Sequence, residues 1–522
     1  MIRRVIRITI IVLMVFVYLT KAHAATSKPS EKEEQQCPSP EGIEDMLPAD
    51  NVSISEHIMQ SEDFKLKYQA KAGTLTIKLS DDGPECSIFF ISYESLDKKE
   101  RSTPLTFVFN GGPGASSAYL HLGTLGPKRV LFQEDKGLLA PPVKIVDNMQ
   151  TWLGFTDLVF VDPIGTGYSR CVQPQENKTE IRAEVKAWGV KEDLNTLAKF
   201  IRLYLTKNNR WLSPKYLIGE SYGGFRVAAL TDYLQTEYDI SLNGVVLISP
   251  ALEFELLQGN EFSLLPSVVT LPSFAATARY HGKAPGSFAD GNDIRKSLAD
   301  IEFFAVQEFL PALAIADTST LNLRLSEFIG LPLQRVTKLN SRVSPRLFAK
   351  ELLQESGRLI SVYDGSVTSI DPNPSSPFSP GIDPYIVQLN NLLAAAFNSY
   401  IREQLKFETD IPYKILNREV SRNWNWRSGL DGAQGFTGVA SNLRKSMSIN
   451  KELRVLIAHG IFDLVTPYFG SVIVSKQMLL DSAIAPNLSL KNYEGGHMFY
   501  TNEEARMRFF EDTRQFFTSI SQ

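Results

Sequence analysis

The sequence predicts an α/β fold in which a mostly parallel central sheet is flanked by helices and interrupted by a mainly helical insertion. Short apolar runs bounded by turn residues have the length of buried strands. The helical segment Trp188 to Leu205 separates two of them, as a crossover between parallel strands requires. The strand pattern stops after Pro250 and resumes near Leu453, which places an insertion between these points. The chain of 522 residues is 43% apolar and 21% charged, so it can bury a large core.

The expected elements follow in chain order. Antiparallel strands open the domain at Phe64 to Leu79 and Ser87 to Ser92. The expected central strands are Leu105 to Phe109, Leu158 to Val161, Tyr216 to Ile218, Val245 to Ile248, Leu453 to Ala458 and Leu488 to Asn492. The expected helices after Pro250 are Asp293 to Phe309, Leu321 to Gly330, Pro345 to Arg358, Tyr385 to Leu405 and the closing Glu503 to Ile520.

The N-terminus has the pattern of a secretory signal peptide, assigned to residues 1–24. Arginines at the start precede the apolar run Ile8 to Leu19, which is too short to span a bilayer comfortably, and Ala22-His23-Ala24 offers a cleavage pattern. Residues 25–60 are expected to form a flexible linker because Pro, Glu, Lys and Ser are frequent there. The mature protein is therefore expected in the periplasm or outside the cell, or in a lysosome or vacuole lumen in a eukaryote, without a membrane anchor.

The remaining chain divides into a core at residues 61–250 and 441–522 and a cap insertion at residues 251–440. A cap in this position would form a wall of the substrate pocket and influence substrate choice. Trp424 and Trp426 lie in the insertion, where they either pack the cap against the core or face the pocket.

Composition argues against several classes of function. The net charge of −4 and the lack of a dense basic tract after the leader give no indication of nucleic acid binding. No Cys and His spacing suggests a metal site and no phosphate-binding glycine loop with lysine occurs, so no cofactor is expected. The three cysteines, Cys37, Cys86 and Cys171, allow one disulfide in an exported protein, and their pairing is left open.

The segment Gly219-Glu220-Ser221-Tyr222-Gly223 predicts a nucleophilic serine. An apolar strand precedes it and the amphipathic run Phe225 to Leu234 follows, which is the strand–turn–helix setting of a G-x-S-x-G elbow. The glycines at Gly219 and Gly223 are expected because a side chain there would collide with the adjoining strand and helix. We therefore expect Ser221 to be exposed on a sharp turn.

A serine nucleophile needs a base and an orienting acid. In an α/β-hydrolase these residues follow the serine in the order acid, then histidine. Asp463 and His497 each come just after an expected strand, where an open parallel sheet collects its chemistry. We therefore predict Ser221, Asp463 and His497 as a catalytic triad, with His459 as an alternative base.

The segment Asn110 to Gly114 predicts a second part of the site. Its three glycines allow the backbone to approach a ligand closely, and Pro113 stiffens the loop. Such a loop after a buried strand suits hydrogen-bond donors aimed at a developing oxyanion.

Four ordered motifs resemble those of the serine carboxypeptidase family. They are Asn110-Gly111-Gly112-Pro113-Gly114-Ala115-Ser116-Ser117, Asp162-Pro163-Ile164-Gly165-Thr166-Gly167-Tyr168-Ser169, Gly219-Glu220-Ser221-Tyr222-Gly223-Gly224 and Gly495-Gly496-His497-Met498. The resemblance runs from about Phe64 to the C-terminus and is greatest to the bacterial branch. It implies an α/β-hydrolase fold and cleavage of C-terminal residues from peptides through an acyl-enzyme. It also implies an oxyanion hole made by the N–H groups of Gly112 and Tyr222.

The resemblance further implies which residues bind the substrate's terminal carboxylate. The expected substrate-binding residues are Asn110, Gly111 and Glu220. The family also uses a second Glu and a Trp, but Thr124 and Val108 stand at those positions here. The expected substrate is therefore a peptide, with a small ester and acyl transfer as the alternative on the same triad.

Overall fold

The computed structural model describes residues 52–61, 64–97, 103–132, 141–172, 182–284, 294–377, 381–427 and 437–518. The predicted signal peptide at residues 1–24, most of the predicted linker and Cys37 lie outside these residues. Among the residues described, no helix is both long and apolar enough to cross a membrane.

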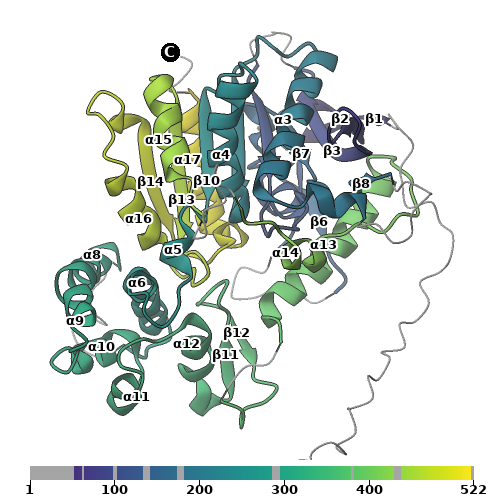
Figure 1. Cartoon of the computed structure of the whole chain (residues 1–522). Helices are drawn as coiled ribbons and strands as arrows, with labels where there is room; N and C mark the ends of the chain where they lie inside the picture. The colour runs from purple at the N-terminus through teal and green to yellow at the C-terminus, as the bar shows by residue number, and fades with distance from the viewer. Residues whose placement is uncertain are drawn as a thin grey trace, which may run out of the picture. The chain divides into compact units, whose positions relative to one another are not determined.

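A ten-stranded mixed sheet forms the centre of the core, in the order β1-β2-β3-β7-β4-β9-β10-β13-β14 with β8 beside β3. The strands from β7 to β14 in this order run parallel, and β1, β2 and β3 are antiparallel. The predicted α/β architecture is confirmed (Figure 1). The strands are β1 Val52–Gln60, β2 Lys65–Lys78, β3 Glu85–Ser95, β4 Leu105–Phe109, β7 Asp157–Val161, β8 Arg170–Cys171, β9 Lys215–Glu220, β10 Gly244–Ile248, β13 Arg454–Gly460 and β14 Leu488–Tyr493.

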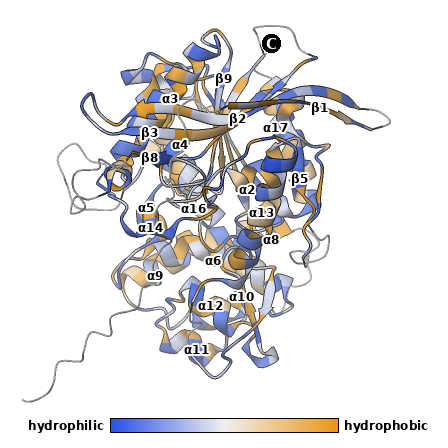
Figure 2. Ribbon diagram, turned by 90° about the vertical axis from the view of Figure 1, so that its right-hand side faces the viewer, coloured by the Kyte–Doolittle hydropathy of each residue, from blue (hydrophilic) through white to orange (hydrophobic). Residues whose placement is uncertain are grey.

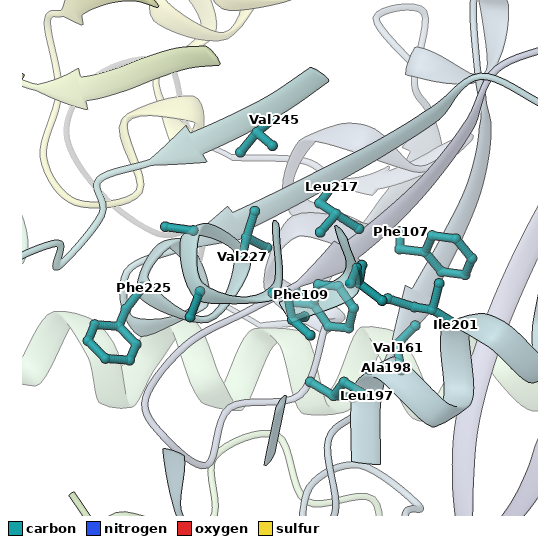
Figure 3. Close-up of a cluster of buried hydrophobic side chains, with 14 of the residues drawn as sticks. Phe107, Phe109, Val161, Leu197, Ala198, Ile201, Leu217, Phe225, Val227 and Val245 are labelled. Carbon is teal, nitrogen blue, oxygen red and sulfur yellow. The ribbon is translucent and has the colours of Figure 1, made fainter. Parts of the chain in front are cut away.

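Helices cover both faces of the sheet. On one face lie α3 Val190–Lys207, α4 Tyr222–Glu237 and α15 Ala440–Ile449, and the other face carries α13 Pro384–Glu403 and α17 Glu503–Thr518. Side chains of each strand alternate between the two hydrophobic clusters, because successive residues of a strand point to opposite faces. Figure 3 shows the first face, where side chains of α3 and α4 pack against Phe107, Leu217 and Val245.

The linker prediction for residues 25–60 is wrong at its end, because Val52–Gln60 forms strand β1 and pairs with β2. The polar composition of the segment concealed a pattern with a period of two residues, which is typical of a strand. Val52, Ile54 and Ile58 lie on one, exposed face of β1, while Met59 on the other face is buried. The alternation, and not the average polarity, was the informative signal.

Most of the insertion forms a separate helical layer, which we call the cap and define as the described residues between 254 and 370. Its helices lie below the sheet in both views (Figures 1 and 2). They are α5 Phe254–Leu257, α6 Leu265–Tyr280, α8 Ile294–Phe304, α9 Leu310–Ala314, α10 Asn322–Ile329, α11 Leu333–Lys338 and α12 Pro345–Glu351. Two short strands, β11 Arg358–Ile360 and β12 Thr368–Ile370, form a hairpin beside them.

Two details of the insertion differ from expectation. The helix predicted over Pro345 to Arg358 ends at Glu351. A short 3-10 turn, Gln354–Ser356, follows, and Gly357 with a φ of 65° ends it and leads into β11. Helix α13, predicted within the insertion, packs in the cluster on the sheet and not with the cap helices. Its apolar stripe, which includes Leu389, Leu393 and Phe397, contacts the core.

A disulfide joins Cys86 of β3 to Cys171 of β8. The sequence left this pairing open. The two cysteines are opposite each other in the antiparallel ladder, so the bond fastens the short strand β8 to the sheet.

Candidate active site

Ser221 lies on a sharp turn between β9 and α4. Its backbone has a φ of 61° and a ψ of −124°, a strained conformation for a residue with a side chain. A Cβ atom on Gly219 would lie 2.0 Å from the carbonyl oxygen of Gly223, and one on Gly223 would lie 2.7 Å from that of Phe109. Both glycines are therefore required for this turn, which places Ser221 on the wall of a cavity.

Asp463 and His497 form a buried pair. The Nδ1 atom of His497 lies 2.8 Å from Oδ2 of Asp463, and both side chains are almost fully removed from solvent. Asp463 also accepts hydrogen bonds from the backbone N–H groups of Val465 and Thr466 and from the Thr466 hydroxyl. These contacts fix the carboxylate and, through it, the orientation of the imidazole ring.

The pair shifts the pKa of both partners toward their charged forms. Burial alone would raise the pKa of Asp463, but the charge of His497 and the hydrogen bonds from His497 and Thr466 lower it overall. Burial alone would lower the pKa of His497, but Asp463 and the charge of Glu220 raise it overall. An imidazole in this setting is a stronger proton acceptor than an isolated one.

The loop after β10 connects the serine to the histidine. The N–H of Ser221 donates to the Ile248 carbonyl at 2.9 Å, and the N–H of Ala251 donates to the Ser221 carbonyl at 3.2 Å. Between them, the hydroxyl of Ser249 donates to the backbone carbonyl of His497 at 2.8 Å. The carboxyl ends of β9, β13 and β14 thus bring the three predicted residues to one edge of the sheet.

His459, the alternative base, is engaged elsewhere. It is fully buried in β13, and its Nε2 atom lies 2.8 Å from the hydroxyl of Ser471 in α16 (Tyr468–Gln477). Burial lowers the pKa of His459 to about 4. This position favours a packing role for His459 and leaves His497 as the better candidate base.

The glycine loop packs directly on the serine turn. A Cβ atom on Gly111 would lie 2.6 Å from the nitrogen of Tyr222, so only glycine allows this approach. Tyr222 begins α4, and the first N–H groups of a helix have no partner within it. Gly112 and Tyr222 line the cavity together with Ser221. Both predicted oxyanion donors therefore belong to residues beside the nucleophile.

Arg226, which the sequence did not indicate, stabilises this loop through hydrogen bonds. Its guanidinium group donates to Asp193 at 2.6 Å and to the carbonyl of Asn110 at 2.5 Å, and it lies over the ring of Tyr222. Arg226 and Asp193 are both buried. The only sequence signal was an arginine within an otherwise apolar face of the helix that follows the serine.

Asn110 and Glu220 are buried and do not belong to the described wall of the cavity. They are 1% and 4% exposed, and among the described residues neither they nor Gly111 line the cavity. Glu220 accepts a hydrogen bond of 2.6 Å from the hydroxyl of Tyr500, which the sequence analysis also missed. Burial raises the pKa of Glu220 to about 7, opposed by His497 and by hydrogen bonds from Tyr500 and Asn110. The expected substrate-binding residues Asn110, Gly111 and Glu220 are thus not on the described wall of the cavity.

The cavity itself has a volume of about 810 Å³ and is bounded by core and cap. Its walls come from the glycine loop, the serine turn, α12, β11 and α14 (Arg418–Arg422). The apolar lining residues include Phe254, Leu257, Leu359, Ile360, Ile386 and Leu464. Trp424 and Trp426 contact the ring of Tyr222 edge-on, as the packing interpretation of these residues predicts.

The turn between β11 and β12 contacts the histidine loop. The carbonyl of Tyr363 accepts the N–H of His497 at 2.5 Å, and its ring meets the imidazole edge-on with 5.7 Å between centroids. The carboxylate of Asp364 accepts the N–H of Gly496 at 3.0 Å. The cap therefore helps to position the candidate base.

Comparisons with known proteins found similarity to serine carboxypeptidases. The model of the serine carboxypeptidase family matches residues 62–261. Residues 62–261 are therefore similar to serine carboxypeptidases. Among curated serine carboxypeptidases of Arabidopsis thaliana, serine carboxypeptidase-like 9 is 29% identical over 181 residues, and serine carboxypeptidase-like 50 is 32% identical over 171 residues. These matches cover 33% and 32% of this chain, but only 38% and 34% of the two relatives.

A solved structure with a similar fold covers most of this chain. The prohormone-processing carboxypeptidase Kex1 of Saccharomyces cerevisiae aligns with a TM-score of 0.54 and 15% identity, covering 87% of this chain and 91% of Kex1. The serine carboxypeptidase segment at 62–261 contains Ser221 and the glycine loop, whereas Asp463 and His497 lie beyond it. The assignment of the acid and base therefore depends on the geometry described above, and the bacterial branch stays a prediction.

Glu220 provides a test of the electrostatics of the site. Replacing Glu220 with glutamine removes a negative charge that helps to raise the pKa of His497, so this pKa should fall. A base with a lower pKa stays neutral at lower pH. The acid limb of kcat/KM is therefore expected to move to lower pH, as measured on a blocked dipeptide. Glu403→Gln, an exposed site on α13, should leave the limb unchanged, and an unchanged limb in Glu220→Gln would contradict the coupling.

Proposed function

We propose that this protein is an exported serine-type carboxypeptidase that hydrolyses C-terminal residues of peptides through an acyl-enzyme. The observation that carries the proposal is the buried Asp463–His497 pair at the sheet edge where Ser221 faces a cavity. Export is supported by the leader pattern and by the Cys86–Cys171 disulfide, since such bonds persist in oxidising compartments.

In the proposed reaction, Ser221 Oγ attacks the carbonyl carbon of the scissile bond while Nε2 of His497 takes its proton. Asp463 stabilises the imidazolium that forms. The N–H groups of Gly112 and Tyr222 stabilise the oxyanion, and one such donor contributes about 3 kcal/mol to the transition state. His497 then protonates the leaving amine, and a water molecule, deprotonated by the same imidazole, hydrolyses the ester to Ser221.

A second candidate is an esterase or acyltransferase that uses the same triad. It is favoured by the sites where this chain departs from the family, namely Thr124 and Val108. It is also favoured by the burial of Asn110 and Glu220 away from the cavity wall, because a carboxypeptidase must recognise a terminal carboxylate.

Product analysis distinguishes these functions. We expect mass spectrometry of a peptide mixture, incubated with the secreted protein, to show loss of single C-terminal residues. Ser221→Ala is the control for contaminating proteases. Loss of two residues would indicate dipeptidyl cleavage. Intact peptides together with hydrolysis of small esters would contradict the carboxypeptidase and support the second candidate.

A further inference from the structure

Three arginines line the cavity beside Ser221. Arg418 and Arg422 are four residues apart on α14, so they project from the same face of this short helix. Arg346 lies on α12 of the cap and also lines the cavity. Within the part of the chain that the structure describes, none of the three is in an ion pair, whereas nearby Arg335 and Arg182 pair with Glu351 and Glu419.

The other charged groups on the cavity wall do not neutralise these arginines. Lys350 is buried in an ion pair with Asp371. The carboxylate of Asp383 accepts hydrogen bonds from the backbone of Val362 at 2.8 Å and Tyr385 at 2.9 Å and from the Ser361 hydroxyl at 3.0 Å. Burial raises the pKa of Asp383, and these hydrogen bonds oppose the shift. The described wall of the cavity therefore has a positive excess.

A positive cavity beside a nucleophile favours an anionic substrate group. A guanidinium group presents a planar pair of donors that matches a carboxylate, and such charge-assisted contacts are about twice as strong as neutral hydrogen bonds. The groups in the family positions, Asn110 and Glu220, are buried, do not line the cavity and contribute no cation. The arginines are the cationic groups on the wall that are free to bind a carboxylate.

We propose that Arg418 and Arg422, with Arg346 of the cap, bind a carboxylate of the substrate and make the protein selective for anionic substrates. The inference deepens the proposed function and depends on it, since it assigns the substrate class of the same site. The carboxylate comes either from the C-terminus of a peptide or from an acidic side chain, and both sources present the same chemistry to the arginines.

The test measures binding apart from catalysis. Ser221→Ala protein is titrated by calorimetry with three blocked dipeptides, namely benzyloxycarbonyl-Phe-Leu, its amide, and benzyloxycarbonyl-Phe-Glu amide. We expect a carboxylate ligand to bind more tightly than the neutral amide. The double substitution Arg418→Gln and Arg422→Gln should reduce this advantage about ten- to hundredfold. Tighter binding of the free acid identifies the C-terminus as the source, and tighter binding of the Glu amide identifies the side chain.

Arg444→Gln is the matched control, because Arg444 is an exposed arginine on α15 outside the lining of the cavity. It should leave all three affinities unchanged. Equal affinities for acids and amide, or an advantage that survives the double substitution, would overturn the inference. Fluorophosphonate labelling of a double variant that retains Ser221 tests separately whether Ser221 is still reactive. Arginine-dependent binding without any peptide hydrolysis would therefore contradict the proposed function but still support the proposed carboxylate site.

Discussion

Replacing Ser221 with alanine is expected to lower turnover about a million-fold where chemistry is rate-limiting. The substitution removes the oxygen that forms the acyl-enzyme. The oxyanion donors and the cavity remain, so a residual rate of about a thousandfold over water is expected. Alanine retains a Cβ atom, so the strained turn with φ of 61° should persist and the effect should be confined to the chemistry.

Covalent labelling measures this result directly. The wild-type protein should gain the mass of one fluorophosphonate adduct on the peptide that contains Ser221, and Ser221→Ala should gain none. Ser421→Ala provides a matched control, because Ser421 is exposed and lines the same cavity. An adduct on another serine in the Ser221→Ala protein would show that the nucleophile has been assigned wrongly.

Asp463→Asn is expected to lower kcat about ten-thousandfold with little change in the fold. The amide oxygen can still accept the N–H groups of Val465 and Thr466. The amide nitrogen, however, would face Nδ1 of His497 and favour the tautomer that carries its proton on Nε2. That tautomer cannot accept the proton of Ser221, and the imidazolium loses its compensating charge.

Steady-state kinetics with a blocked dipeptide would measure the loss, and thermal unfolding would check that the variant is folded. Substitution of His497 by glutamine should cost at least as much. His459→Gln distinguishes the two histidines, since a residue bound to Ser471 should affect stability more than turnover. A large loss of kcat in folded His459→Gln, with activity retained in His497→Gln, would exchange their roles.

Local patterns in the sequence were sufficient for much of the fold. The central strands are uninterrupted apolar runs because both faces of a parallel sheet are covered by helices. The serine turn was readable because a Cβ atom on Gly219 would collide with the nearby Gly223, although the contact that requires glycine at 223 is with the distant Phe109. Strand β1 was missed because its exposed face carries Val52, Ile54 and Ile58 among polar residues. The average composition of that segment suggested a linker.

Long-range contacts account for what the sequence could not indicate. Arg226 acts on the glycine loop across 116 residues, and Tyr500 reaches Glu220 across 280. The pairing of Cys86 with Cys171 depends on strand register, which no spacing rule provides. That Asn110 and Glu220 are buried and do not line the cavity also required coordinates, because a motif gives the identity of a side chain and not its surroundings.

The contact between the Tyr363 carbonyl and the backbone of His497 has a consequence for engineering this protein. Exchange of helices α8 to α11 for those of a relative would leave this contact in place, but α6 belongs with the turn, because Nε2 of His281 at its end lies 2.7 Å from the carbonyl of Gly365. The hairpin turn at residues 361–367 cannot be exchanged so freely, because it is a structural partner of the histidine loop. A chimera should therefore inherit this turn together with the C-terminal part of the core.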